Sequence, residues 1–233
     1  GGTSSLTTSA NDAVITLNQT NNAFTGAVSL TTSGTAGNVV IDNGTTALDL
    51  GASTISGTLS ATSGAEAGIV DSGNIAVSGD VTLTTDANNG VINLGTLQQS
   101  GGDLILTTNG TGDATVVNNA AIDLGASTVG GALSATASAG TITQNGGALT
   151  VAGTSSFTTS TADQAITLSN TANALSGAVS LTTSGTAGHV TIDNGTTALG
   201  VQGTVSGDLV LTSGDMITDS DVLTVTGTTT VTT

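Results

Sequence analysis

Few side chains in this sequence could do acid–base or metal chemistry, and they do not form a known motif. His189 is the only imidazole, and the tightest acidic group is the segment GDMITDSD, which holds Asp215, Asp219 and Asp221. Carboxylate oxygens are the ligands that Ca²⁺ prefers, but this spacing matches neither the EF-hand loop nor the glycine-rich nonapeptide repeat. We therefore expect only weak divalent-cation binding at these three aspartates, and no resident cofactor.

His189 has no evident catalytic partner. Internal alignment puts it in the position that Asn38 fills in an earlier copy of the sequence, with Ala114 as the approximate counterpart in the middle copy. A position that accepts such different residues is typical of a surface corner rather than of a general base. Glycan-cleaving β-helix enzymes use clustered carboxylates, often with a basic residue, and this chain has no Lys or Arg. We predict that it is not an enzyme and has no catalytic residues.

The composition limits both the core and the partners. Among 233 residues there are 34 Gly and two Phe but no Cys, Pro, Trp or Tyr, so Val, Ile, Leu and Ala must fill the interior. The formal charge is −16 with nothing basic to offset it, which argues against nucleic acid as a partner. No segment is long and apolar enough for a membrane helix, so we expect no membrane-spanning part.

The sequence repeats itself on a large scale. The stretch GAVSLTTSGTAG occurs twice, at 26–37 and 177–188, within a longer match of 2–48 to 153–199. A weaker match at half that offset aligns GASTISGTLSAT from Gly51 with GASTVGGALSAT from Gly125. One continuous domain over 1–233 is therefore expected, with tandem copies at about 2–78, 79–152 and 153–227 and the next copy starting at 228–233.

A shorter phrase of alternating apolar and hydroxyl residues, such as VSLTT, recurs within each copy. Alternation with a period of two predicts half-buried strands, and Thr, Val and Ile favour them. Two segments carry residues suited to tight corners, because Asn and Gly accept positive φ angles. These structural corners are Asp42, Asn43 and Gly44, and Asp193, Asn194 and Gly195.

Equivalent phrases at regular intervals predict an all-β fold, a parallel β-solenoid of about nine turns. In that arrangement the recurring phrase follows one ladder of strands, and the two identical stretches lie about six turns apart. One Thr of each Thr-Thr pair is expected to point inward or into a corner. A sandwich of hairpins is the alternative, but it gives no reason for one phrase to recur in every unit. Both ends of the solenoid are predicted to be uncapped, which would attract further turns.

Two closing phrases carry a family resemblance. GTITQNGGALTVAGTSSFTT from Gly140 and GDMITDSDVLTVTGTTTVTT from Gly214 resemble the repeats of giant secreted bacterial proteins of the filamentous haemagglutinin-like, two-partner-secretion type. This resemblance implies a right-handed β-helix and an extracellular location at the bacterial cell surface.

The functional prediction is a non-enzymatic structural segment of an extracellular fibre or adhesin shaft. Its expected partners are copies of itself, or adjoining turns of a longer chain, joined end to end, and surface glycans are a further candidate. The alternative is a carbohydrate-active or carbohydrate-binding β-helix protein. Ice binding by threonine rows and functional amyloid are lesser alternatives.

Overall fold

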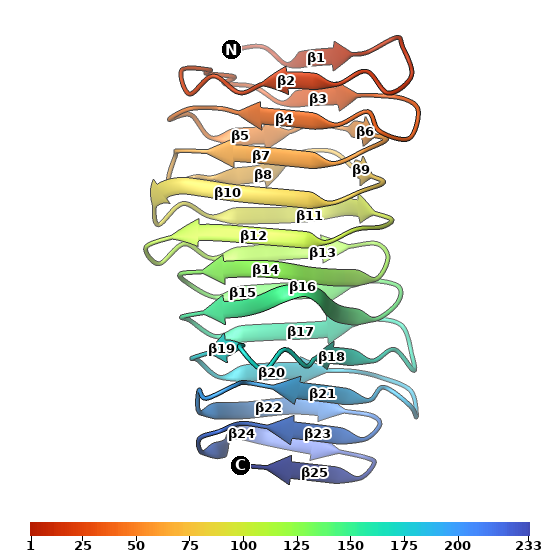
Figure 1. The fold of residues 1–233 in the computed structure, drawn as a ribbon, viewed down its shortest axis with the longest axis vertical. Coiled ribbons are helices and arrows are strands. Elements are labelled where there is room, and N and C mark those ends of the chain that lie inside the picture. Colours follow the sequence, from red (N-terminus) through yellow and green to blue (C-terminus); the bar gives the residue numbers. More distant parts are fainter.

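The computed structural model describes all 233 residues and contains 25 strands and no helix. The strands coil into one continuous column, with the chain ends at opposite ends of its long axis (Figure 1). The structure holds no helix with the length and apolar character needed to cross a membrane. The prediction of an all-β parallel solenoid is confirmed.

Two parallel sheets face each other across the core, and the chain passes from one to the other and back in each turn. The first sheet has 13 strands: β1 (Ser4–Thr7), β3 (Val28–Thr31), β5 (Leu48–Leu50), β6 (Ser53–Ile55), β8 (Ile69–Asp71), β9 (Ile75–Val77), β11 (Ile92–Gln99), β13 (Ala114–Asn118), β15 (Leu133–Ala137), β17 (Ser155–Thr159), β20 (Val179–Thr182), β22 (Leu199–Val205) and β24 (Ile217–Val225). The second sheet has 12: β2 (Ile15–Leu17), β4 (Val39–Asp42), β7 (Leu59–Ser63), β10 (Val81–Asn88), β12 (Leu104–Asn109), β14 (Ile122–Val129), β16 (Ile142–Val151), β18 (Ile166–Leu168), β19 (Ala174–Leu175), β21 (Val190–Asp193), β23 (Leu209–Thr212) and β25 (Thr229–Thr232).

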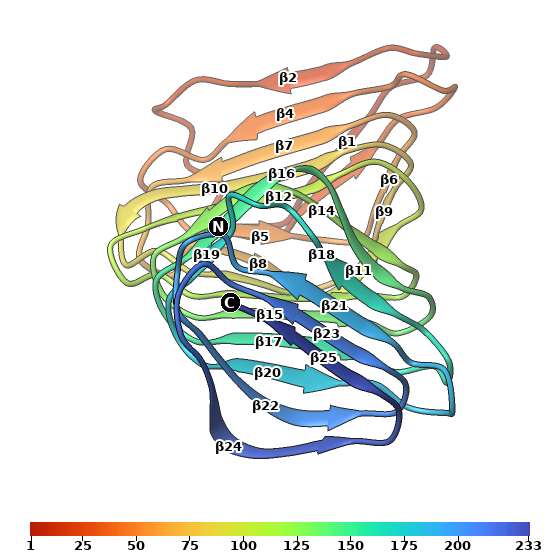
Figure 2. The ribbon, with the colours of Figure 1, turned by 60° about the horizontal axis from the view of Figure 1, so that its bottom comes forward.

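The coil is right-handed. In Figure 1 the chain descends from its N-terminus while the nearer strands run to the left and the fainter, more distant strands run to the right. The stack has about ten turns rather than the nine counted from the sequence. Figure 2 shows the turns overlying one another with a gradual twist, as expected for sheets of L-residues.

In-register stacking explains why the sequence repeats. Ala135 of β15 pairs with Phe157 of β17, which pairs in turn with Leu181 of β20, so apolar side chains form continuous columns inside. A single hydrophobic cluster of 44 buried residues runs through the column. Because each turn covers the apolar side chains of its neighbours, no turn could bury its own residues alone.

The recurring phrase does not follow one ladder as expected, but changes sheet. It lies on the first sheet at β1 and β3, on the second at β7, β10 and β12, on the first at β15, β17 and β20, and on the second at β23. Two successive phrases on the same sheet, such as those at Leu6 and Leu30, lie close together in the sequence. Two successive phrases on different sheets, such as those at Leu30 and Ala61, lie further apart. The shorter spacing is therefore one turn and the longer spacing is one and a half turns.

Each sequence copy consequently spans three and a half turns. The identical stretches containing β3 and β20 lie on the same sheet seven strands apart, not six turns apart as the sequence suggested. Copies offset by half that distance face opposite ways: Gly57 precedes β7 on the second sheet, and its counterpart Gly131 precedes β15 on the first. The two sheets therefore carry nearly the same sequence pattern in alternation.

The threonine pairs divide between surface and core. Thr182 is exposed at the end of β20, whereas Thr183 is buried and its Oγ1 donates to the carbonyl oxygen of Gly188 at 2.8 Å. The same inward bond is made by Thr32, Thr85, Thr108 and Thr159. The outer threonines form columns on the sheets, such as Thr136, Thr158, Thr182, Thr204 and Thr224.

Candidate functional site

Carboxylates at the corners accept hydrogen bonds from the backbone of the following turn. Asp12 shows the arrangement: its Oδ1 accepts the N–H groups of Thr35 at 2.6 Å and Ala36 at 2.8 Å. Asp163 accepts two equivalent N–H groups one turn further along the chain. Corner N–H groups have left the sheet ladder, so each needs another acceptor, and a carboxylate is a strong one.

Local backbone geometry sets up these contacts. Asp12 and Asp163 have positive φ angles of 61° and 63°. Gly34, with φ of 94°, lies directly under Asp12, where a Cβ would be 2.7 Å from the Asp12 nitrogen. In the middle copy Asn89 has φ of 66°, and its Oδ1 accepts the N–H of Thr111 at 2.8 Å. The three copies thus build the same corner with Asp, Asn and Asp.

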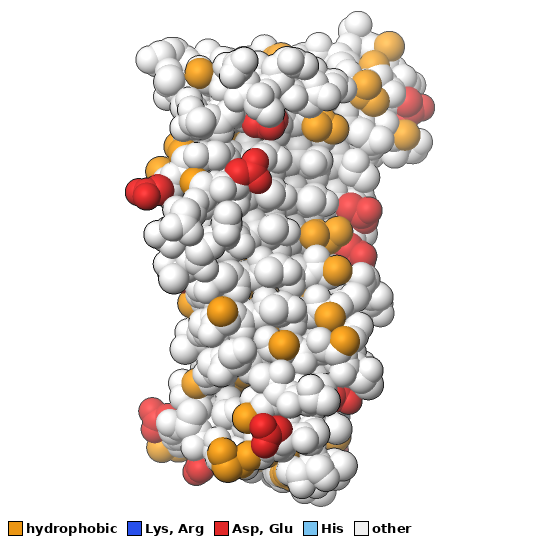
Figure 3. All heavy atoms as spheres, turned by 60° about the vertical axis from the view of Figure 1, so that its left-hand side comes forward, with side chains coloured by type: hydrophobic (Ala, Val, Ile, Leu, Met, Phe, Trp, Pro, Cys, Tyr) orange, Lys and Arg blue, Asp and Glu red, His pale blue; other side chains and the backbone are white.

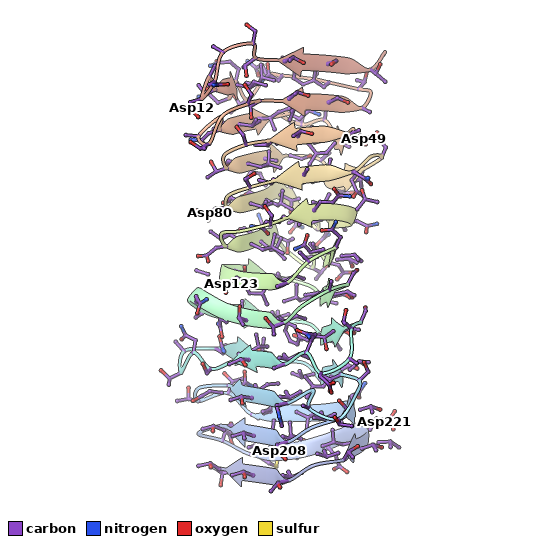
Figure 4. All side chains as sticks on the ribbon, turned by 90° about the vertical axis from the view of Figure 1, so that its right-hand side faces the viewer. Asp12, Asp49, Asp80, Asp123, Asp208 and Asp221 are labelled. Carbon is purple, nitrogen blue, oxygen red and sulfur yellow. The ribbon has the colours of Figure 1, made fainter.

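Every carboxylate of this kind points toward the C-terminal neighbour. We call the seven residues the inter-turn aspartates: Asp12, Asp71, Asp80, Asp113, Asp123, Asp163 and Asp208. Figure 4 labels Asp12, Asp80, Asp123 and Asp208 of this set at several levels of the column. Asp12 and Asp80 lie toward one edge, and Asp49 and Asp221, which do not belong to the set, lie toward the other. The contacts join successive turns at several levels of the column: Asp71 and Asp123 lie within β8 and β14, and the other five lie in the corners.

The pKa values of Asp12 and Asp163 are lowered, chiefly by these backbone hydrogen bonds. A lowered native pKa means that stability is fully present above the ordinary value of 3.8 and is lost as pH falls through the native value.

We expect the Asp12→Asn and Asp163→Asn double variant to fold normally, since Asn89 occupies the same position, but to lose less stability in acid. Melting temperatures measured from neutral pH to below 3.8 would show a shallower acid decline than in the parent chain. Identical acid declines in the two proteins would contradict this assignment.

A buried asparagine holds the opposite side of each copy. Asn194 is fully buried; its Oδ1 accepts the N–H of Leu175 at 2.8 Å, and its Nδ2 donates to the carbonyl oxygens of Leu175, Thr197 and Ala198. Asn43 and Asn118 make corresponding contacts. This side chain replaces the missing ladder partner where the strand bends out of the sheet.

Two of these asparagines, Asn43 and Asn194, are the central residues of the predicted structural corners. Gly44 and Gly195 have φ angles of 55° and 56°. The N–H of each glycine donates to the aspartate two residues earlier, Asp42 and Asp193, at 2.8 and 2.9 Å. Asp-Asn-Gly therefore forms a tight turn whose central side chain points inward and whose flanking carboxylate closes the turn.

His189 is exposed and belongs to the same class of corner contact. Its Nδ1 accepts the N–H of Asp208 at 2.9 Å and lies 3.5 Å from the Asp208 carboxylate. Asn38 and Asp113 perform this role in the other copies, accepting from Thr58 and Ala132. The middle-copy counterpart of His189 is thus Asp113, not Ala114 as the approximate alignment suggested.

Asp215, Asp219 and Asp221 are exposed and do not act together as one group of ligands. Asp215 and Asp221 accept the N–H groups of the residues that follow them, both at 2.7 Å. Asp219 occupies the position equivalent to Asp71, whose carboxylate accepts N–H groups of the next turn. The structure contains no group of three or more His, Cys, Asp or Glu side chains placed to hold a metal ion.

One line of carboxylates lies on adjoining turns. Asp103 donates its backbone N–H to Asp80, while its own carboxylate is partly buried and faces Asp123 on the other side. Desolvation, followed by the charges of Asp123 and Asp80, raises the pKa of Asp103. A raised native pKa destabilises the folded chain as pH rises above 3.8 through the native value.

The Asp103→Asn variant should therefore melt at a higher temperature than the parent chain at neutral pH. The difference should disappear in acid, where Asp103 is protonated in both the folded and the unfolded chain. Thermal unfolding at the two pH values tests this, with Asp86→Asn as the control because Asp86 is exposed. A gain that persists unchanged in acid would assign the effect to packing instead.

The carboxylates, the buried asparagines and His189 therefore serve as hydrogen-bond partners for backbone N–H and carbonyl groups. The carboxylates are spread over the surface, separated by uncharged atoms on the face drawn in Figure 3.

The inter-turn aspartates were not predicted from the sequence because their hydrogen-bond partners lie on another turn, far along the chain. The alignment of Asp12, Asn89 and Asp163 across the three copies was the available signal.

The fold and its corner contacts define the chain as a repeat protein of the parallel β-solenoid class. It belongs to the family described as "Repeats of unknown function (DUF5649)", whose model matches residues 1–31, 36–98, 111–182 and 187–233. No curated protein and no solved structure matches the chain.

Proposed function

We propose that this chain is a non-enzymatic structural segment of an extracellular fibre or adhesin shaft at the bacterial cell surface, which provides reach, cohesion and attachment. The observation that carries the proposal is the unbroken pairing of parallel strands through both sheets, from β1 to β24 and from β2 to β25. A column built in this way lengthens by adding turns without any change of design.

The polar contacts support a load-bearing role. Besides the strand ladders, the inter-turn aspartates join successive turns, five of them at the corners, and each buried corner asparagine bridges neighbouring turns. Pulling two turns apart would break ladder bonds, corner bonds and apolar contacts together. Cohesion along the axis is therefore distributed over all sides of the column.

The proposed partners are adjoining turns of a longer chain or neighbouring copies, joined end to end. The parallel pairing of equivalent strands through both sheets supports this, because the same pairing can join one turn to any equivalent turn. Surface glycans are a second proposed class of partner. Nucleic acid is not proposed, since a chain with a formal charge of −16 and no Lys or Arg would be repelled by phosphates.

The extracellular assignment rests on the resemblance to haemagglutinin-like repeats. The two segments that carry it contain β16 and β24, which are equivalent strands on opposite sheets. The non-enzymatic assignment rests on the use of carboxylates as backbone acceptors. Hydrolysis of a glycosidic bond needs two carboxylates that converge on one bond, and even in the line of Asp80, Asp103 and Asp123 the two outer carboxylates accept backbone N–H groups.

Labelling of intact and permeabilised cells of the source bacterium with an antibody to this segment tests the location. We expect the intact cells to be labelled along fibres, with a spacing of about 4.8 Å along the fibre axis in diffraction. Labelling that requires permeabilisation would overturn the extracellular proposal. Turnover of a polysaccharide in a lyase or hydrolase assay would overturn the non-enzymatic one, and a glycan array would identify a glycan partner.

A further inference from the structure

Asparagine followed by glycine is the most labile dipeptide for spontaneous deamidation, because a glycine nitrogen has no Cβ beside it to hinder attack on the asparagine side chain. The fold decides which of these pairs can react, since the attacking nitrogen and the amide carbon must meet. The chain has five such pairs, at Asn43, Asn89, Asn109, Asn145 and Asn194.

At Asn43 and Asn194 the glycine nitrogen and the asparagine side-chain amide are held apart. Both asparagines are fully buried, and their amide groups are bonded to backbone on two turns. The nitrogens of Gly44 and Gly195 donate to the preceding aspartates instead of approaching the amides. Attack would require the corner to unfold.

The pairs at Asn89 and Asn145 are exposed but engaged elsewhere. The Oδ1 of Asn89 accepts from both Thr111 N and Thr111 Oγ1 at 2.8 Å, while the nitrogen of Gly90 donates to Ala87. The Nδ2 of Asn145 donates to the Asp123 carboxylate at 2.5 Å, and the following glycine is paired within the β14–β16 ladder. Each amide is bonded to a residue of another turn rather than to the glycine that follows it.

Asn109 differs from the other four. It is exposed at the end of β12, and the nitrogen of Gly110 donates to its Oδ1 at 2.9 Å, so the attacking atom already lies against the side-chain amide. Gly110 has φ of 63° and is itself exposed. The only other bond of the Asn109 side chain is a long one of 3.4 Å to the carbonyl oxygen of Asp86.

We propose that Asn109 is a site of covalent self-modification by deamidation. The Gly110 nitrogen gives its proton to solvent base and forms a bond to Cγ of Asn109. Nδ2 takes up a proton from solvent, the bond from Cγ to Nδ2 breaks, and ammonia leaves, which completes a cyclic imide. Water then opens the imide at Cγ to give Asp, or at the main-chain carbonyl to give isoaspartate. One water is consumed, one ammonia is released, and no oxidant or reductant takes part.

The modification is specific to the middle copy. Ser33 and Ser184 occupy the equivalent position, each followed by a glycine with positive φ, Gly34 and Gly185. An isoaspartate would lengthen the backbone in the corner between β12 and β13, where Asn89 bonds to Thr111. Modification would therefore loosen one corner in the middle of the column and add a negative charge there.

The test is to age the folded full-length chain in mildly alkaline buffer and to map the five sites by peptide mass spectrometry. A protease that does not need Lys or Arg is required. We expect Asn109 to react at least about tenfold faster than Asn43, Asn89, Asn145 and Asn194, a difference of about 1.4 kcal/mol in activation free energy. In denaturant the five rates should converge.

The matched control is Asn109→Ser, which installs the residue of the other copies and should abolish the fast reaction without changing the melting temperature. Any other pair reacting as fast as Asn109 in the folded chain would overturn the proposal, as would a ranking that survives denaturation. The outcome is independent of whether the chain forms a fibre.

Discussion

The Phe157→Ala variant should lose about 3 to 5 kcal/mol of unfolding free energy, the usual loss for a large aromatic removed from a packed core. Phe157 is fully buried and is the largest side chain of the interior. Its ladder neighbours are Ala135 on one side and Leu181 on the other, so the ring fills space that the small Ala135 leaves open. Urea unfolding followed by far-ultraviolet circular dichroism measures the loss.

Phe157→Leu is the matched control because Leu6, Leu30 and Leu181 occupy equivalent positions in other turns. It should cost only about 1 to 1.5 kcal/mol. If the Ala and Leu variants were equally stable, the ring would not be packed in the interior as described. Loss of packing confined to the central turns would appear as faster hydrogen exchange in β15, β17 and β20.

Asn194→Ala should cost about 3 kcal/mol or more, because it leaves one N–H and three carbonyl groups without their bonds in a fully buried corner. Asn194→Asp should be worse at neutral pH, since a carboxylate oxygen would then face those carbonyl oxygens in place of Nδ2. Acidification should recover part of the Asp variant's loss, because a protonated carboxyl can donate one bond.

Asn18→Ala serves as the control for this pair, because Asn18 is exposed and should tolerate the change with little effect. Thermal and urea unfolding at neutral and acidic pH measure all three variants. A loss below about 1 kcal/mol for Asn194→Ala would mean that water replaces the side chain, and the corner would then not depend on it.

Much of the fold could be predicted because the sequence repeats at two scales, by alternation within strands and by recurrence of whole phrases. The alternation in segments such as GAVSLTT predicted strands, and repetition of whole phrases predicted in-register stacking. The Asp-Asn-Gly segments could be read as corners because they combine residues that tolerate positive φ. None of this required contacts between distant residues to be known.

The change of sheet could not be predicted without the length of a turn. A long interval between phrases, such as that from Leu181 to Leu211, can be one long turn or one and a half short ones, and the phrase itself is the same on either sheet. For the same reason His189 could not be matched to Asp113, since an error of one residue in a corner leaves the strand pattern intact. Side-chain bonds across turns depend on that register.

The half-turn advance of each sequence copy affects the shape of a long array. If one sheet always had the longer strands or the looser packing, the axis of the column would curve steadily toward one side. Here the same imbalance reappears on the opposite side after three and a half turns, so successive bends cancel over two copies. An array of many such copies would therefore extend straight, even though no single copy is symmetric.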